Sequence, residues 1–267
     1  MDLNAMFNQP DEKPLDNLVT DGGFCGIFRK IGCIGDSLSS GEFEGINAEG
    51  QKTYHDYFDY SWGQYLARMA GCTVYNFSRG GMTASEYCNT FAEANGYWDR
   101  DKACTAYIIA LGVNDLFGQK QKIGSVDDID FRNYKNNKPT FAGYYARLIQ
   151  AYKRIQPDAK FFLMTTPRSD DDEEIVCLKQ QHADLLHKLA EVFDNCYVLD
   201  FWKYAPVYDK DFKEKFFLGG HMNPMGYLLT AKMVASYIDF IIRHNMKDFA
   251  QVGFIGTEHQ YREVTTD

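Results

Sequence analysis

The alternation of two kinds of segment along the chain constrains its fold more than any other feature of the sequence. Five short apolar runs lack strict apolar/polar alternation, which is typical of strands that are covered on both faces. These predicted strands span residues 29–34, 73–77, 106–111, 160–165 and 196–200. Helical patterns lie between or after them, at residues 62–70, 83–94, 141–155, 174–193 and 224–243. This order predicts an α/β fold, a three-layer α/β/α sandwich with a five-stranded parallel sheet.

A chain of 267 residues without internal repeats or low-complexity linkers is expected to form one domain. We assign that domain to residues 1–267, with a core at about 29–243. An N-terminal extension (1–28), a loop (38–60) and a C-terminal tail (245–267) lie outside the core pattern. Because ligands of parallel sheets bind outside the carboxyl ends of the strands, the residues after each predicted strand are the candidates for function.

The composition excludes several classes of partner. A formal net charge of -9 argues against nucleic acid, whose binding rests on Lys and Arg. The polar, acidic start of the chain lacks a secretory signal, and the apolar stretches are shorter than a membrane span, so we expect no membrane association. Seven scattered cysteines without a Cys-x-x-Cys pair indicate reduced thiols in a cytoplasmic protein. We expect no metal and no cofactor.

Glycine-bearing turns follow the first three predicted strands, and another precedes the last helix. Ser37 lies in Gly-Asp-Ser-Leu at 35–38, Gly81 in Asn-x-x-x-x-Gly-x-Thr at 76–83, and Asn114 in Gly-x-Asn-Asp at 112–115. His221 begins His-x-Asn-Pro and follows two glycines. Each segment by itself is typical of an ordinary turn or helix cap. Three other histidines fall on helical patterns and are expected at the surface: His182, His187 and His244.

Taken together and in this order, the four segments resemble the four blocks of the SGNH/GDSL hydrolases over about residues 29–243. The resemblance implies the flavodoxin-like SGNH fold and a serine esterase. Ser37 would be the nucleophile, and His221 would be its base. The backbone N–H groups of Ser37 and Gly81 and the side-chain amide of Asn114 would form the oxyanion hole. These roles agree with the chemistry, because a serine hydroxyl needs an adjacent base and a tetrahedral oxyanion needs fixed donors.

The sequence departs from the family pattern at one position. The family usually has an aspartate three residues before the histidine to orient the imidazole, and Leu218 stands there. We expect a Ser–His dyad, with Nδ1–H of His221 bonded to a backbone carbonyl near Leu218. The alternative is a displaced carboxylate, for which there are four candidates: Asp200, Asp209, Asp211 and Glu214.

Loop 38–60 leaves the nucleophile directly and is rich in acidic and aromatic residues, so we expect it to form one wall of the pocket. Aromatic faces beside carboxylates suit sugars, although ordinary packing under a long loop has the same composition. The predicted substrate contacts are Asp36, Asp115, Glu42 and Tyr54. We expect an esterase that removes an acetyl or other short acyl group from a small-molecule ester, such as an acetylated sugar. The alternatives are a lysophospholipase or thioesterase, and a non-catalytic carbohydrate- or ligand-binding domain on the same fold.

Overall fold

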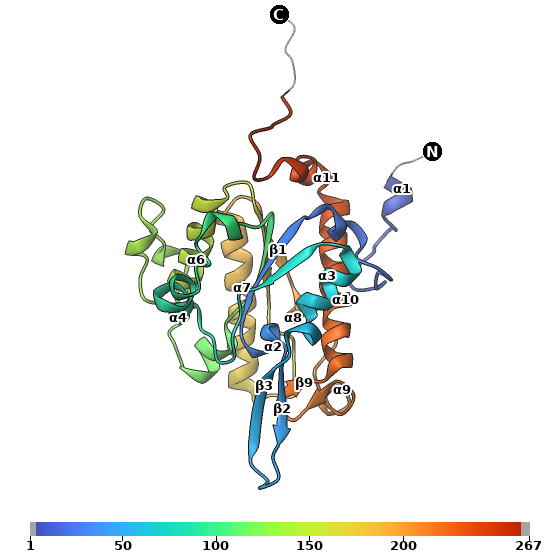
Figure 1. Ribbon diagram of the computed structural model, residues 1–267, viewed down its shortest axis with the longest axis vertical. Helices are drawn as coiled ribbons and strands as arrows, with labels where there is room; N and C mark the ends of the chain where they lie inside the picture. The colour runs from blue at the N-terminus through green and yellow to red at the C-terminus, as the bar shows by residue number, and fades with distance from the viewer. Residues whose placement is uncertain (1–3, 263–267) are drawn as a thin grey trace, which may run out of the picture.

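The computed structural model describes residues 4–262 and contains a five-stranded parallel sheet between two layers of helices (Figure 1). The strand order is β4–β1–β5–β6–β7. The bounds are β1 Lys30–Gly35, β4 Thr73–Asn76, β5 Ala106–Ala110, β6 Lys160–Met164 and β7 Cys196–Leu199. Each predicted strand is present to within one residue at either end, and the predicted fold class is confirmed.

The helices follow the predicted pattern with one interruption. Helices predicted at 62–70 and 141–155 have those bounds, and the two longest agree to within one residue. The segment predicted at 83–94 is instead divided by a π-helical turn over Tyr87–Phe91. The α-helices are α1 Asn4–Phe7, α2 Ser37–Ser40, α3 Trp62–Ala70, α4 Ala84–Glu86, α5 Ala92–Ala94, α6 Phe141–Ile155, α7 Glu173–Val192, α8 Phe201–Tyr204, α9 Lys210–Phe216, α10 Pro224–His244 and α11 Met246–Phe249.

Each face of the sheet carries its own hydrophobic core. On one face, α3 and α10 pack with buried aromatic residues such as Trp62 and Tyr227. On the other face, α4, α6 and α7 enclose a second core that includes Tyr107 and Tyr145. Figure 1 shows these two groups of helices on opposite sides of the strands. Burial of both faces explains why the predicted strands do not alternate between apolar and polar residues.

Helix α10 is the longest helix and belongs to the core. Asn223 caps it by accepting a hydrogen bond from the N–H of Gly226, and Pro224 occupies its first turn. Within residues 4–262, α10 is the one helix that is long and apolar enough to cross a membrane, with a mean hydropathy of 1.3. The expectation that every apolar stretch is shorter than a membrane span is therefore wrong for α10. However, 72% of its most apolar window is buried inside the protein, as in the core helix of a soluble fold.

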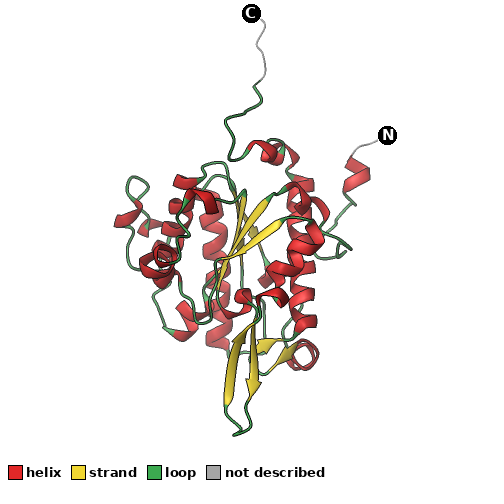
Figure 2. Cartoon of the chain, in the orientation of Figure 1, coloured by secondary structure: helices red, strands yellow, loops and turns green. Residues whose placement is uncertain are grey.

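The segment 38–60, predicted as a loop, contains a β-hairpin. Strands β2 (Glu42–Ile46) and β3 (Lys52–Asp56) pair antiparallel and form a separate two-stranded sheet. Figure 2 shows this hairpin, which we call the arm (42–56), extending beyond the carboxyl ends of the parallel strands. A second, smaller hairpin pairs β8 (Phe217–Leu218) with β9 (His221–Met222), and β2 packs against it. Most arm residues are partly exposed, which explains why no buried-strand pattern marks the arm in the sequence.

Candidate active site

Ser37 lies directly after the carboxyl end of β1, as the first residue of α2. Asp36 caps this short helix, and its Oδ1 accepts a hydrogen bond from the N–H of Leu38 at 3.1 Å. A Cβ at Gly35 would lie 2.2 Å from Ser39 Oγ, so only glycine permits the tight turn. Ser37 Oγ has no hydrogen-bond partner within the described residues and is therefore available to a substrate.

The two other predicted oxyanion donors lie beside this turn. The Asn114 amide Nδ2 donates to Asp36 Oδ2 at 3.4 Å and to the carbonyl of Met82 at 3.2 Å. Asn114 follows β5, Asp36 follows β1 and Met82 lies in the loop after β4, so these two bonds hold the segments after the three strands together. Gly81 has a φ of +72° and open space beside its Cα, so this conformation favours glycine and leaves the peptide accessible. The structure thus brings Ser37, Gly81 and Asn114 together at one edge of the sheet.

Two buried carboxyl groups underlie these donors. Burial raises the pKa of Asp36 to about 6 and that of Asp115 to about 7. Asp115 is 0% exposed, and its Oδ1 accepts a hydrogen bond from the N–H of Ala84 at 2.9 Å. The expectation that Asp115 contacts substrate is therefore wrong, because its side chain fixes the start of α4 and cannot reach a ligand. Asp36 is also buried, but it lines a small cavity beside the site.

His221 lies on β9, three residues before α10, and β9 packs against α2, the short helix that begins with Ser37. Its side chain is 15% exposed. Nε2 lies 3.0 Å from Glu42 Oε1, and the ring of Tyr54 packs edge-on with a centroid separation of 5.6 Å. Two of the predicted substrate contacts, Glu42 and Tyr54, therefore adjoin the predicted base. Both come from the arm.

The expected dyad geometry is wrong. His221 Nδ1 is buried and has no hydrogen-bond partner within residues 4–262, whereas we expected a backbone carbonyl near Leu218. Leu218 instead pairs with His221 across the short hairpin, and the residue is 51% exposed. The carboxylate nearest to Nδ1 is that of Glu44, whose Oε2 lies at 3.9 Å. None of the four sequence motifs includes Glu44. The sequence signal was the spacing Glu-x-Glu at 42–44, which places both side chains on one side of a strand.

The four candidates for a displaced acid are engaged elsewhere. Asp200 pairs with His187 at 2.9 Å, and Asp209 caps α9 through the N–H of Phe212. Asp211 and Glu214 form ion pairs within α9, with Lys215 and Lys210. None of these four carboxylates contacts His221 in the described part of the chain. The prediction that one of them is the displaced acid is therefore wrong.

The electrostatics of the two arm carboxylates differ. Burial raises the pKa of Glu42, and the nearby His221 opposes this shift. The pKa of Glu44 is lowered, first by Lys52, whose Nζ lies 2.6 Å from Glu44 Oε1, and then by the N–H of Gly220, which donates to Oε2 at 2.9 Å. Glu44 is therefore the more firmly anchored and the more readily ionised of the two.

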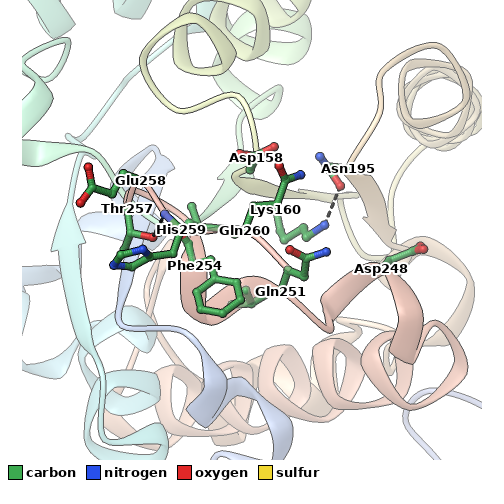
Figure 3. A pocket seen from close by; sticks show the side chains of 12 residues that line it. Asp158, Lys160, Asn195, Asp248, Gln251, Phe254, Thr257, Glu258, His259 and Gln260 are labelled. Carbon is green, nitrogen blue, oxygen red and sulfur yellow. Dashed lines mark hydrogen bonds between the residues drawn. The ribbon is translucent and has the colours of Figure 1, made fainter. Parts of the chain in front are cut away.

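A small cavity of about 80 Å³ opens beside Asp36 at the ends of β1, β5 and β6. Its walls are mostly apolar, and they include Leu38, Val113, Met164 and Pro167. Larger cavities lie away from these residues. One of about 350 Å³ is at the amino ends of β6 and β7, the opposite edge of the sheet, and Lys160, Asn195 and His259 line it (Figure 3).

The sequence and the fold both resemble those of known ester hydrolases. The sequence profile of the GDSL-like lipase/acylhydrolase family matches residues 33–229. Curated proteins give no match to the chain. A family two carbohydrate esterase from Clostridium thermocellum in complex with cellohexaose is 16% identical with a TM-score of 0.53, and the alignment covers 82% of this chain and 65% of that one. A family 2 carbohydrate esterase with a carbohydrate binding domain from Corynascus thermopiles (Myceliophthora fergusii) is 16% identical with a TM-score of 0.54, covering 84% and 67%.

A family 3 carbohydrate esterase from Clostridium thermocellum is 15% identical with a TM-score of 0.52, and the alignment covers 81% of this chain and 98% of that chain. Identities this low show a shared fold. The family profile carries more weight, because its match spans most of the chain and includes Ser37, Gly81, Asn114 and His221. With its predicted site residues gathered at one edge of the sheet, this chain belongs to the GDSL-like lipase/acylhydrolase family, a family of ester hydrolases.

Proposed function

We propose that the protein is a serine esterase that removes a short acyl group, foremost acetyl, from the hydroxyl of a carbohydrate. One observation carries the proposal: the Asn114 amide links the turn that holds Ser37 to the loop that holds Gly81, beside a cavity of about 80 Å³. This arrangement offers a free hydroxyl, nearby donors and room for a small acyl group.

In the proposed reaction, Ser37 Oγ attacks the ester carbonyl carbon while His221 Nε2 accepts the hydroxyl proton. The resulting oxyanion accepts hydrogen bonds from Ser37 N–H and Gly81 N–H, and from the Asn114 amide once that amide releases Asp36, the longer of its two bonds. Collapse of this intermediate breaks the bond to the sugar oxygen, which takes the proton from His221. Water then attacks the acyl-serine by the same steps, releasing the carboxylic acid and restoring Ser37.

Glu42 has to leave His221 before this reaction, because its carboxylate occupies Nε2 in the free protein. A sugar hydroxyl that donates a hydrogen bond to Glu42 compensates for the contact with His221 that is lost. The adjacent residue Tyr54 is 54% exposed, and its ring offers an aromatic face to the same sugar. These contacts support a polar, hydroxyl-bearing alcohol, and Glu42 and Tyr54 are the residues that we propose for its recognition.

The size of the cavity favours a short acyl group. An engineered cavity of about 150 Å³ in another protein holds benzene, so about 80 Å³ accommodates an acyl group of two or three carbons. A long-chain lysophospholipase or thioesterase would need a larger apolar channel. The fold that this chain shares with carbohydrate esterases supports a carbohydrate as the alcohol part of the ester.

The test is hydrolysis of p-nitrophenyl esters of graded acyl length, together with acetylated oligosaccharides. We expect acetyl esters to be preferred and Ser37→Ala to abolish hydrolysis and fluorophosphonate labelling while the protein stays folded. Retention of most activity by a clean Ser37→Ala preparation, or a preference for acyl chains of eight or more carbons, would contradict the proposal.

A second candidate is a non-catalytic carbohydrate-binding domain. The close contact between the Glu42 carboxylate and His221 Nε2, at 3.0 Å, favours it, since in that state Glu42 and not Ser37 lies against this nitrogen. Calorimetric binding of oligosaccharides without hydrolysis, combined with no fluorophosphonate labelling of Ser37, would identify this alternative.

A further inference from the structure

The imidazole of His221 lies between two carboxylates of the same strand. Glu42 and Glu44 are two residues apart on β2, so their side chains point to one side of the arm. Glu42 Oε1 is 3.0 Å from Nε2, and Glu44 Oε2 is 3.9 Å from Nδ1. We infer that Glu44 is the positioning acid of this site and holds Nδ1–H of His221 in the role that the family gives to an aspartate at position 218. The inference rests on the proposed function, in which His221 is the base.

The state of Nδ1 is the first argument. This nitrogen is buried and has no partner among residues 4–262, although buried polar groups in proteins are nearly always hydrogen-bonded. A shift of the imidazole by about 1 Å toward Glu44 brings Nδ1 from 3.9 Å to an ordinary hydrogen-bond distance of Glu44 Oε2. Hydrogen bonds of catalytic groups are often long in the free enzyme and shorten when substrate binds.

The anchoring of Glu44 is the second argument. Lys52 from β3 and the backbone N–H of Gly220 each bind one of its oxygens, at 2.6 Å and 2.9 Å. Its side chain is only 8% exposed. A fixed, ionised carboxylate is what an imidazole needs, both to keep the tautomer with a basic Nε2 and to stabilise the imidazolium that forms.

The glycines before His221 permit this approach. A Cβ at Gly219 would lie 2.4 Å from Glu44 Oε1, so any side chain there would displace the carboxylate. Gly219 also has a φ of +63°, which favours glycine. The carboxylate of Glu44 is thus held beside Nδ1 by Lys52 and by the Gly219-Gly220 turn.

Glu42 does not suit the same role. It contacts Nε2, the nitrogen that has to receive the proton of Ser37, so it competes with the nucleophile. No lysine or arginine in the described part of the chain pairs with Glu42. The two carboxylates therefore have different functions, with Glu44 orienting the ring and Glu42 leaving it when substrate enters.

Kinetics of the full-length protein provide the first part of the test. Glu44→Gln should lower kcat by about 10²–10⁴-fold with KM changed by less than about threefold, because an amide traps the wrong tautomer. Glu44→Asp, which keeps the carboxylate, should recover part of the loss. Lys52→Gln should move the acid limb of the kcat–pH profile to higher pH, because it removes the main cause that lowers the pKa of Glu44. Glu49→Gln, on the exposed turn of the same arm, is the matched control and should leave kcat within about twofold.

Nuclear magnetic resonance of ¹⁵N-labelled histidine provides the second part and needs no activity. We expect a proton on His221 Nδ1 in Glu42→Ala, which removes the carboxylate from Nε2, and its loss when Glu44→Gln is added to that variant, with His221→Gln used to assign the signal. If no form of the protein hydrolyses any ester, the proposed function fails, while the Nδ1 proton still decides the role of Glu44. The inference is overturned if that proton is unchanged when Glu44→Gln is added to Glu42→Ala, or if active Glu44→Gln keeps kcat within about threefold of the wild type.

Discussion

Replacing Asp115 by asparagine should stabilise the protein above pH 7 but not at pH 5. Asp115 is 0% exposed, and its Oδ2 has no hydrogen-bond partner within the described residues. Burial, with a smaller contribution from the Asp36 carboxylate, raises its pKa from 3.8 to about 7. A group whose pKa is raised by folding contributes stability below its unfolded pKa, and that stability is lost as the pH rises through the folded pKa.

The magnitude follows from this shift, since each pKa unit corresponds to about 1.4 kcal/mol. Ionisation of Asp115 costs the folded state about 4 kcal/mol at pH 8, of which about 3 kcal/mol is incurred between pH 5 and pH 8. An asparagine keeps the bond to Ala84 through its oxygen but buries an unpaired amide, which costs about 1–3 kcal/mol. The variant should therefore be more stable than the wild type by about 1–3 kcal/mol at pH 8, and equal or less stable at pH 5.

Urea unfolding followed by tryptophan fluorescence at pH 5, 6, 7 and 8 measures this difference. Asp59→Asn, at an exposed position, is the control and should show no pH-dependent difference from the wild type. If the unfolding free energies of wild type and Asp115→Asn change in parallel with pH, Asp115 is already ionised at pH 5 and the reasoning from its burial is refuted.

Three further substitutions test other parts of the site. Gly81→Ala forces an alanine to a φ of +72°, so we expect a stability loss of about 1–2 kcal/mol in thermal melts and a fall in kcat of about 10²–10³ from a displaced oxyanion donor. Met164→Ala enlarges the small cavity and should raise the ratio of kcat/KM for butyrate over acetate esters; an unchanged ratio would place the acyl group elsewhere. Asp200→Asn should leave kcat within about threefold, because Asp200 pairs with His187 and not with His221. Its stability loss should be larger at pH 5 than at pH 9, since this pair raises the pKa of His187 and stabilises the protonated ring.

The parallel sheet was predictable because its strands are buried on both faces, which leaves continuous apolar runs such as the one at 106–111. The turns that follow β1, β4 and β5 were predictable for a related reason. A turn that brings backbone close to a ligand demands glycine, so Gly35 and Gly81 mark these sites in the sequence.

The surroundings of His221 were not predictable in the same way. Glu44 lies 177 positions before it in the chain, on a strand whose residues are partly exposed, so neither spacing nor periodicity connects the two. His182 illustrates a similar limit. It falls on a helical pattern and was expected at the surface, but it is 1% exposed, and burial lowers its pKa to about 4. The pattern of α7 did not distinguish this position from the exposed ones.

The arm has a consequence for the thermal behaviour of the site. Among the residues that the structure describes, its two strands pair with each other and with no third strand, and hairpins of this kind are marginally stable in isolation. Phe43, packed against Tyr57, Tyr60 and Tyr227, provides its apolar attachment to the rest of the fold. Local opening of such a unit needs less free energy than global unfolding, and it removes both carboxylates from His221 at once. We therefore expect the site to come apart at a lower temperature than the two hydrophobic cores, because its acidic residues depend on the attachment of one hairpin.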